Sequence, residues 1–172
     1  MTRRIADMDN IVKGEMEKYE DAMKRLEEIP GIGERSAQVI LAEIGLDMSR
    51  FPTAKHLCAW AGVAPGNNES AGKRYSGKTR KGNATLKTTL IQCAKSGKKK
   101  GSFFKAQFDR IATRRGKNRA TVAVAHSMLI AIYYMLKNNQ PFVDLGESYY
   151  TQFNTERKIN HYFKKLNELG WQ

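Results

Sequence analysis

The most apolar segment of the chain, Thr121 to Leu136, limits the folds that this sequence can adopt. It lies between Arg119 and Lys137 and is too short to cross a bilayer. We therefore expect a buried helix over residues 119–137, at the centre of a core that other helices must cover. This interpretation predicts a protein without a membrane span.

Apolar residues recur at helical spacing on both sides of this segment, and no period-two strand pattern of convincing length is present. The predicted class is therefore all-α, a helical bundle over residues 29–172 preceded by an amphipathic, coiled-coil-like linking helix over 1–28. That first helix is equally typical of the first helix of a bundle. Further helices are expected over residues 54–62, 84–96, 102–115 and 154–169, the last with an apolar stripe of Ile159, Tyr162, Phe163 and Leu166.

Residues 29–45, IPGIGERSAQVILAEIG, form the most specific local pattern. Pro30 and Gly31 end the first helix, Gly33 is expected to make a tight turn with positive φ, and Glu34 begins a second helix. This resembles a helix-hairpin-helix, in which amides of the turn, here at Gly31 and Gly33, contact a DNA phosphate without reading sequence. The alternative is an ordinary helical hairpin whose glycines only make the turn.

The positive charge of the chain is concentrated in one segment. The formal net charge is +13, yet residues 73–119 hold 16 Lys and Arg residues against a single acid, Asp109. That balance of +15 leaves −2 for the remainder of the chain. Such a distribution favours a polyanionic partner, nucleic acid more often than an anionic membrane surface.

Residues 65–83, PGNNESAGKRYSGKTRKGN, stand between two apolar helical segments and are expected to form a mobile surface loop. Glycines would let main-chain amides approach a phosphate backbone, and the cations would neutralise its charge. Ser70 lies among small residues where a bulky substrate could reach it, so it is a candidate nucleophile, although composition alone favours a solvated linker. The candidate phosphate contacts are Lys73, Arg74, Lys78, Arg80, Lys81, Arg114, Arg115 and Lys117.

Metal and redox chemistry have little support in the sequence. Cys58 and Cys93 have neither a disulfide framework nor zinc-site spacing, and are expected to be reduced core thiols of a cytosolic protein. His56 has no partner at metal-ligand spacing. Trp60 is interpreted as a core anchor rather than as a platform for base stacking.

Several motifs occur together in one order: the IPGIG hairpin, LCAWAG over 57–62, VAP over 63–65, SAGK over 70–73 and RRGKNRA over 114–120. With this order and spacing, the chain from Ile29 to Trp171 resembles the C-terminal transposase domain of the IS110 insertion-sequence family. The resemblance implies a serine-bearing helical domain that is joined to a RuvC-like nuclease domain, and a structured bridge RNA as a partner.

In that family a small-residue motif, usually Ser-Gly-Gly-Lys, carries the nucleophile, which corresponds to Ser70 here. The resemblance implies that this serine attacks a DNA phosphodiester and forms a covalent phosphoserine, assisted by an acidic tetrad and Mg²⁺ in the RuvC-like domain. Ala71 replaces the first glycine of the motif. Ser76 is the nearest rival nucleophile, with Tyr75 behind it.

Four carboxylates framed by RuvC-type strands are not found in the sequence. The chain is therefore expected to be the C-terminal part of a transposase that binds DNA, is homo-oligomeric when full-length, has no cofactor of its own and lies in the prokaryotic cytoplasm near the nucleoid. Two other interpretations remain open. One is a non-catalytic helix-hairpin-helix module or inactive remnant, and the other is an RNA-binding accessory protein.

Overall fold

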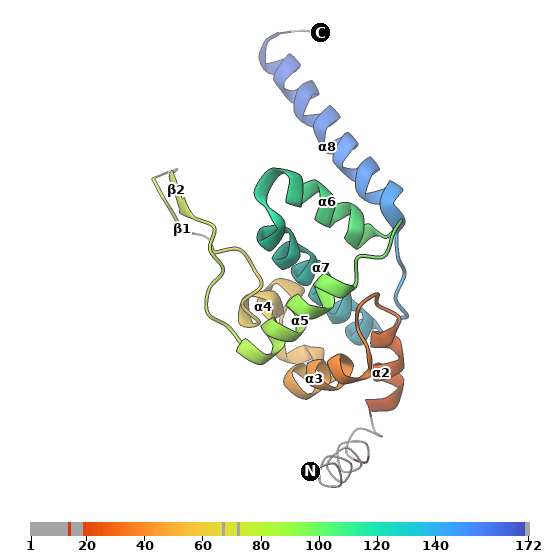
Figure 1. Ribbon diagram of the computed structural model, residues 1–172. Coiled ribbons are helices and arrows are strands. Elements are labelled where there is room, and N and C mark those ends of the chain that lie inside the picture. Colours follow the sequence, from red (N-terminus) through yellow and green to blue (C-terminus); the bar gives the residue numbers. More distant parts are fainter. Residues whose placement is uncertain (1–13, 15–18, 67, 72, 171–172) are drawn as a thin grey trace.

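Figure 1 shows the computed structural model of the chain, which describes residues 14, 19–66, 68–71 and 73–170. The regular elements of this described part are helices apart from one short two-stranded hairpin, so the predicted all-α class is confirmed. Most of the linking helix predicted over residues 1–28 lies outside the described residues. The elements are α2 (Glu20–Glu27), α3 (Glu34–Ile44), the 3-10 helix η2 (Met48–Arg50), α4 (Ala54–Trp60), β1 (Asn68–Ser70), β2 (Lys73–Ser76), α5 (Ala84–Ser96), α6 (Phe103–Arg115), α7 (Lys117–Asn138) and α8 (Gly146–Glu168).

Helix α7 passes through the centre of the domain, as the apolar segment predicted (Figure 1). Val124, Met128 and Ile132 on this helix are fully buried, and α4, α5 and α6 all pack against it. The helix is longer than predicted. Its 22 residues would suffice, by length and composition, to cross a membrane, but half of that apolar stretch is buried inside the domain. Such burial is typical of a core helix.

Helices α3 and α5 pack on this core with the faces that their apolar spacing predicted. The Asn83 side chain accepts a hydrogen bond from the Leu86 amide (2.9 Å), which caps α5, and donates one to the Glu43 carboxylate on α3 (2.6 Å). One side chain therefore fixes the start of α5 and ties it to α3. The apolar residues buried on these two helices recur at helical spacing, and Ile91 is partly buried beside them: Ala37, Ile40, Leu41, Ile44, Leu86, Leu90 and Ala94.

The turn between α2 and α3 differs from the prediction. Gly31 has a φ of +92°, whereas Gly33 has φ −112° and ψ 176°, an extended conformation that any residue adopts. The prediction of a positive φ at Gly33 is therefore wrong, and the left-handed turn falls on Gly31. A Cβ on Gly31 would lie 2.4 Å from the Cys93 carbonyl oxygen, because the turn docks against the C-terminal end of α5.

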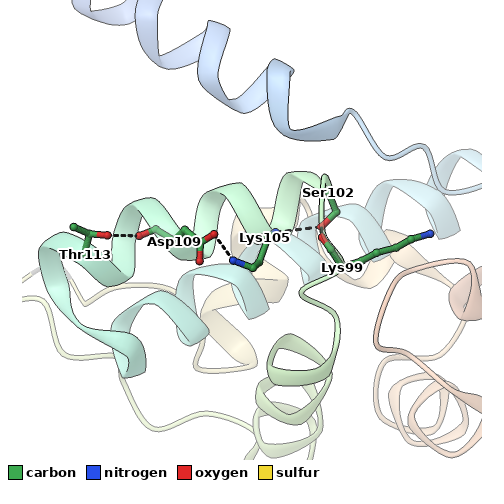
Figure 2. Close-up of polar contacts among 5 residues, drawn as sticks. All are labelled: Lys99, Ser102, Lys105, Asp109 and Thr113. Atoms are coloured by element: carbon green, nitrogen blue, oxygen red, sulfur yellow. Dashed lines mark hydrogen bonds and ion pairs between the residues drawn. The ribbon is translucent and has the colours of Figure 1, made fainter.

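Helix α6 begins with a side-chain cap and holds Asp109, the single acid of residues 73–119, in an ion pair (Figure 2). The Ser102 hydroxyl accepts from the Lys105 amide (3.2 Å) and donates to the Lys99 carbonyl (2.6 Å). One turn later the Lys105 ammonium pairs with the Asp109 carboxylate, and the Thr113 hydroxyl donates to the Asp109 carbonyl (2.8 Å). Asp109, the single acid of this segment, is thus paired within its own helix.

Helix α8 differs most from the prediction. It begins at Gly146 rather than near residue 154, so part of the segment predicted to be irregular is helical. Its first turn is joined to the loop before α6, where the Glu147 amide donates to the Gly101 carbonyl (3.0 Å), and the rest extends away from the domain (Figure 1). The predicted apolar stripe is consequently exposed on Ile159, Tyr162, Phe163 and Leu166.

Both cysteines lie buried in the core as reduced thiols, as the sequence predicted. Burial raises the pKa of the Cys58 thiol to about 12 and also raises the pKa of Cys93. Because the thiolate is the reactive form, both side chains are inert at neutral pH.

Candidate functional site

The segment predicted to be a mobile loop contains a short antiparallel hairpin that projects from the side of the domain (Figure 1). We call residues 66–78 the serine hairpin. Its strands pair in the register Asn68 with Ser76 and Ser70 with Lys73, with an irregularity after Asn68. The prediction of a loop throughout is therefore wrong over β1 and β2, whose alternation is too short to be recognised in the sequence.

Close backbone contacts join residues 62–66 to residues 78–82, and we call these two segments the stem of the serine hairpin. A Cβ on Gly66 would lie 2.3 Å from the Lys78 carbonyl oxygen, and one on Gly82 would lie 2.4 Å from the Gly62 nitrogen. A side chain at either position would force backbone atoms apart. These glycines therefore serve close packing at the stem rather than approach to a ligand.

Ser70 is the last residue of β1 and pairs with Lys73 beside the turn. Ala71, which follows it, has φ +50°, a left-handed conformation that costs a residue with a Cβ about 1–2 kcal/mol and that glycine adopts freely. The departure from the family motif thus falls where the backbone favours glycine. The rival Ser76 ends β2 at the base of the hairpin, where it pairs with Asn68.

A cleft of about 1000 Å³ lies between the base of the serine hairpin and the junction of α6 with α7. The hairpin contributes Gly77 and Lys78 to its lining, and the helices contribute Arg115 and Arg119. Ile111 is one of several aliphatic residues in the walls, and no acid lines the cleft among the described residues. Electrostatics therefore favours an anionic ligand with an apolar part.

Gln107 and His126 add polar side chains to the same cleft. The Gln107 Nε2 donates to the Ser127 hydroxyl (2.9 Å), while its Oε1 is buried and has no hydrogen-bond partner among the described residues. Burial lowers the pKa of His126, so the imidazole is neutral at pH 7. The sequence analysis missed both residues, because helical spacing alone does not mark which face of a helix borders a cleft.

The predicted phosphate contacts divide between this cleft and its surroundings. Lys78 and Arg115 line the cleft, and Arg119, which the sequence analysis did not single out, joins them there. Lys73 and Arg74 lie on β2 of the serine hairpin. The remaining predicted contacts are exposed and adjoin these positions in the chain: Arg80, Lys81, Arg114 and Lys117.

The two glycines predicted to contact phosphate do not line this cleft. Gly31 packs against the end of α5, where the Ser96 hydroxyl also donates to its carbonyl oxygen (3.3 Å). Gly33 is exposed at the start of α3, whose first turn has no side-chain cap. Only Gly33 therefore keeps the open amide setting that the helix-hairpin-helix prediction requires.

Trp60 is not the core anchor that the sequence predicted. Its side chain is 41% exposed, and its ring packs against that of Phe51 with 5.6 Å between centroids. Leu57 and Cys58 occupy the buried face of α4 instead.

Among the described residues, no group of three or more His, Cys, Asp or Glu side chains is placed to hold a metal ion. The His56 Nδ1 instead lies 2.9 Å from the Thr53 hydroxyl oxygen at the start of α4. The candidate site thus consists of a projecting serine hairpin, a cationic cleft at its base and, on a residue that lines this cleft, a buried amide oxygen that has no hydrogen-bond partner among the described residues.

Residues 23–109 match the family described as "Transposase IS116/IS110/IS902 family". The chain is 32% identical over 117 residues to the "Insertion element IS110 uncharacterized 43.6 kDa protein" of Streptomyces coelicolor. The aligned stretch covers 66% of this chain and 28% of that protein. It is 31% identical over 120 residues to the pilin gene-inverting proteins of Moraxella bovis and Moraxella lacunata, which covers 66% of this chain and 36% of each relative. The matched part of the chain therefore spans roughly a third of these relatives.

Proposed function

Because the chain belongs to the IS116/IS110/IS902 family of transposases, we propose that it is the DNA-binding, serine-bearing domain of a transposase that cleaves and rejoins DNA through a covalent phosphoserine. One observation supports this most. Ser70 ends a strand beside a turn, on a hairpin whose base borders a cleft lined by Lys78, Arg115 and Arg119. A nucleophile for a bulky polyanion must stand out from the fold and lie near cations.

In the proposed step, the Ser70 hydroxyl oxygen attacks the phosphorus of a DNA phosphodiester. An Oγ–P bond forms and a P–O bond to the strand breaks. The serine proton passes to a base, which gives a proton to the strand oxygen so that it leaves as a hydroxyl. Rejoining reverses the step, because a strand hydroxyl attacks the phosphoserine and restores the serine. A serine hydroxyl is a weak nucleophile, so the step needs a base, a metal or cations near the developing charge.

The partners follow from the same proposal. The RuvC-like domain that the resemblance implies would bind Mg²⁺ and complete the catalytic site, while this chain would bind no cofactor. DNA and a structured bridge RNA are the proposed partners, in a homo-oligomer of the full-length enzyme in the prokaryotic cytoplasm. Because RNA pairing would read the target sequence, the cations of this chain need only hold phosphates.

DNA binding through this surface should depend strongly on salt. Each Lys or Arg that neutralises a phosphate releases counterions, so the affinity for duplex DNA is expected to fall about a hundredfold between roughly 50 and 200 mM salt for about four contacts. An affinity that stays flat over this range would count against the basic surface as the DNA contact.

The test of the chemistry joins this chain to the RuvC-like domain of a family member and incubates the protein with Mg²⁺, its RNA and labelled donor DNA. The unchanged chain is expected to form a protein–DNA adduct that survives denaturation. Ser70→Ala should form none, because the Oγ–P bond cannot form. Ser76→Ala is the matched control and should retain the adduct, whereas loss in Ser76→Ala with survival in Ser70→Ala would move the nucleophile to Ser76.

A second candidate function, a remnant that binds nucleic acid without cleaving it, is favoured by Ala71, whose φ of +50° strains the turn beside the serine. For this candidate, salt-dependent DNA binding persists but no adduct forms, even when Ala71→Gly relaxes the turn. An adduct that forms only in Ala71→Gly would instead show that the strained turn silences a competent Ser70.

A further inference from the structure

We propose that the cleft at the base of the serine hairpin binds an unpaired nucleotide of the DNA, with its base inside the cleft and its phosphate at the rim. This inference rests on the proposed function, since it assumes that DNA lies along the serine hairpin. It assigns a ligand class to the cleft formed by residues of α6, α7 and the hairpin stem.

The size and lining of the cleft suit a base. Its volume of about 1000 Å³ is at the upper end of the range typical of small-ligand sites. Val63, Ile111 and Val122 give it aliphatic walls, which can cover the faces of a base that has left its stack. Duplex DNA as a whole cannot enter such a cleft, so a single unstacked nucleotide is the part of DNA that fits.

An unsatisfied amide supplies the polar contact that a base would complete. The Gln107 Nε2 donates to Ser127, and its Oε1 is buried without a partner among the described residues. Exchanging the amide oxygen and nitrogen of Gln107 still leaves one of these atoms unpaired. The Ser127 hydroxyl can pair with either atom, and the other atom then has no partner. Gln107 lines the cleft, so a rotation of its side chain would bring the unpaired end to the cleft surface, where the exocyclic amine or ring nitrogen of a base can pair with it and an aliphatic ligand cannot.

The charges of the cleft suit the phosphate of the same nucleotide. Lys78, Arg115 and Arg119 line it without any acid among the described lining residues, and both arginines are exposed. An Arg guanidinium can hold a phosphate through two hydrogen bonds or stack on a base. Phosphate at the rim and base against the aliphatic walls is therefore the arrangement that these residues favour.

The cleft is also close to the proposed nucleophile along the chain. Gly77 and Lys78 in its lining directly follow β2, while Ser70 pairs with Lys73 near the tip. About three residues of β2 separate Lys73, opposite Ser70, from the cleft, which corresponds to roughly 10 Å of extended strand. A nucleotide held in the cleft would therefore keep the strand unpaired within reach of the serine hairpin.

The test measures binding of the complete chain to a short duplex with one bulged 2-aminopurine and to the same duplex without the bulge. We expect the bulged duplex to bind about tenfold more tightly, because it presents an unpaired base without the cost of unpairing, and 2-aminopurine emission to rise as the base unstacks. Val122→Phe fills the cleft and Gln107→Leu removes the amide, so each should reduce the preference to about twofold or less while duplex binding persists. Gln92→Leu, the same change at an exposed position of α5, is the matched control and should keep the preference.

The outcomes separate this inference from the proposed function. If the chain binds both duplexes equally, or if both cleft variants keep the preference, the inference is overturned while DNA binding stands. If neither duplex binds, the proposed function fails, and titration with deoxyadenosine monophosphate decides the inference by NMR of the His126 ring, which lines the cleft. Ring shifts that Val122→Phe abolishes would support the nucleotide site, and their absence in the unchanged chain would overturn it.

Discussion

Two turns of this molecule were both predicted to meet phosphates, yet they are built in opposite ways. The helical turn at residues 28–33 is packed into the domain, with Gly31 against the end of α5. The serine hairpin projects from the domain and has Ala71, not glycine, in the left-handed conformation at its tip. Glycine in a turn can therefore signal close packing as readily as ligand approach, and burial around the turn distinguishes the two.

The charges around the two turns differ in the same sense. The helical turn begins at one acid, Glu28, and is followed by another, Glu34. The Glu28 carboxylate accepts a hydrogen bond from the Phe142 amide (2.9 Å). The cleft beside the serine hairpin is lined by Arg115 and Arg119 without an acid among the described residues. Phosphate contact is therefore expected mainly at the serine hairpin, and the helical turn has chiefly a structural role.

The largest expected effect is on stability at the helical turn. Gly31→Ala adds a Cβ 2.4 Å from the Cys93 carbonyl oxygen and 2.5 Å from the Gly97 nitrogen, at a φ of +92°. Strain and overpacking together should lower the free energy of unfolding by about 3 kcal/mol. Urea denaturation followed by circular dichroism measures this change.

Gly33→Ala is the control for that measurement. Gly33 has an extended backbone, and no atom lies within 4 Å of the position that a Cβ would occupy. Its substitution should therefore lower the free energy of unfolding by less than about 1 kcal/mol. Equal losses at Gly31 and Gly33 would contradict the packed turn. A large loss of DNA affinity in a stable Gly33→Ala protein would instead restore the helical turn as a phosphate contact.

The next effect is on DNA affinity at the cleft beside the serine hairpin. Replacing Arg115 and Arg119 together by Gln should weaken duplex binding by about tenfold and reduce the slope of log affinity against log salt by about 2, because each arginine is expected to neutralise one phosphate. Fluorescence anisotropy over a series of salt concentrations measures both quantities.

Arg35→Gln is the matched charge removal at the helical turn, since Arg35 is exposed in the first turn of α3. Per charge removed, Arg35→Gln should change the slope of log affinity against log salt by much less than the two substitutions at the cleft. If Arg35→Gln produced the same change per charge, the two turns would contribute equally to DNA binding, and phosphate contact would not be concentrated beside the serine hairpin.

Much of the fold could be predicted because it is local. The helical period of α3 and α5 gave their buried faces, and Gly33 and Asn83 mark where these helices begin. The start of α8 could not be predicted because it depends on distant contacts. The Asp144 carboxylate accepts from the amides of Gly146 (2.9 Å) and Phe103 (3.0 Å), and this joins two segments far apart in the sequence.

The candidate site divides in the same way. Ser70 and the basic residues near it could be named from a contiguous motif and its family resemblance. Arg119, Gln107 and His126 could not, because their cleft forms only when the hairpin stem, α6 and α7 come together. The conformation of Ala71 was missed for a related reason, since the hairpin register sets its φ.

A smaller stabilising effect is expected at the tip of the serine hairpin. Ala71→Gly removes the strain of a left-handed alanine but increases the freedom of the unfolded chain, so the net gain should be about 0.5 kcal/mol. Ala84→Gly, at the exposed start of α5, is the control and should lower stability instead. Urea denaturation measures whether each substitution raises or lowers the free energy of unfolding. A loss of stability in Ala71→Gly would contradict a strained turn.

The smallest effect is the pH dependence that His126 brings to the cleft beside the serine hairpin. Burial lowers the pKa of His126 in the folded chain below its ordinary value of 6.5, so the unfolded chain binds the proton more readily. Its contribution to stability is therefore present above pH 6.5 and is lost as the pH falls through the folded-state pKa.

Urea denaturation from pH 7.5 down to about pH 5 should show a decline in the free energy of unfolding that His126→Gln reduces. His161→Gln, on the exposed part of α8, is the control and should leave the decline unchanged. A decline that is identical in His126→Gln would show that this side of the cleft is more open to water than its packing indicates.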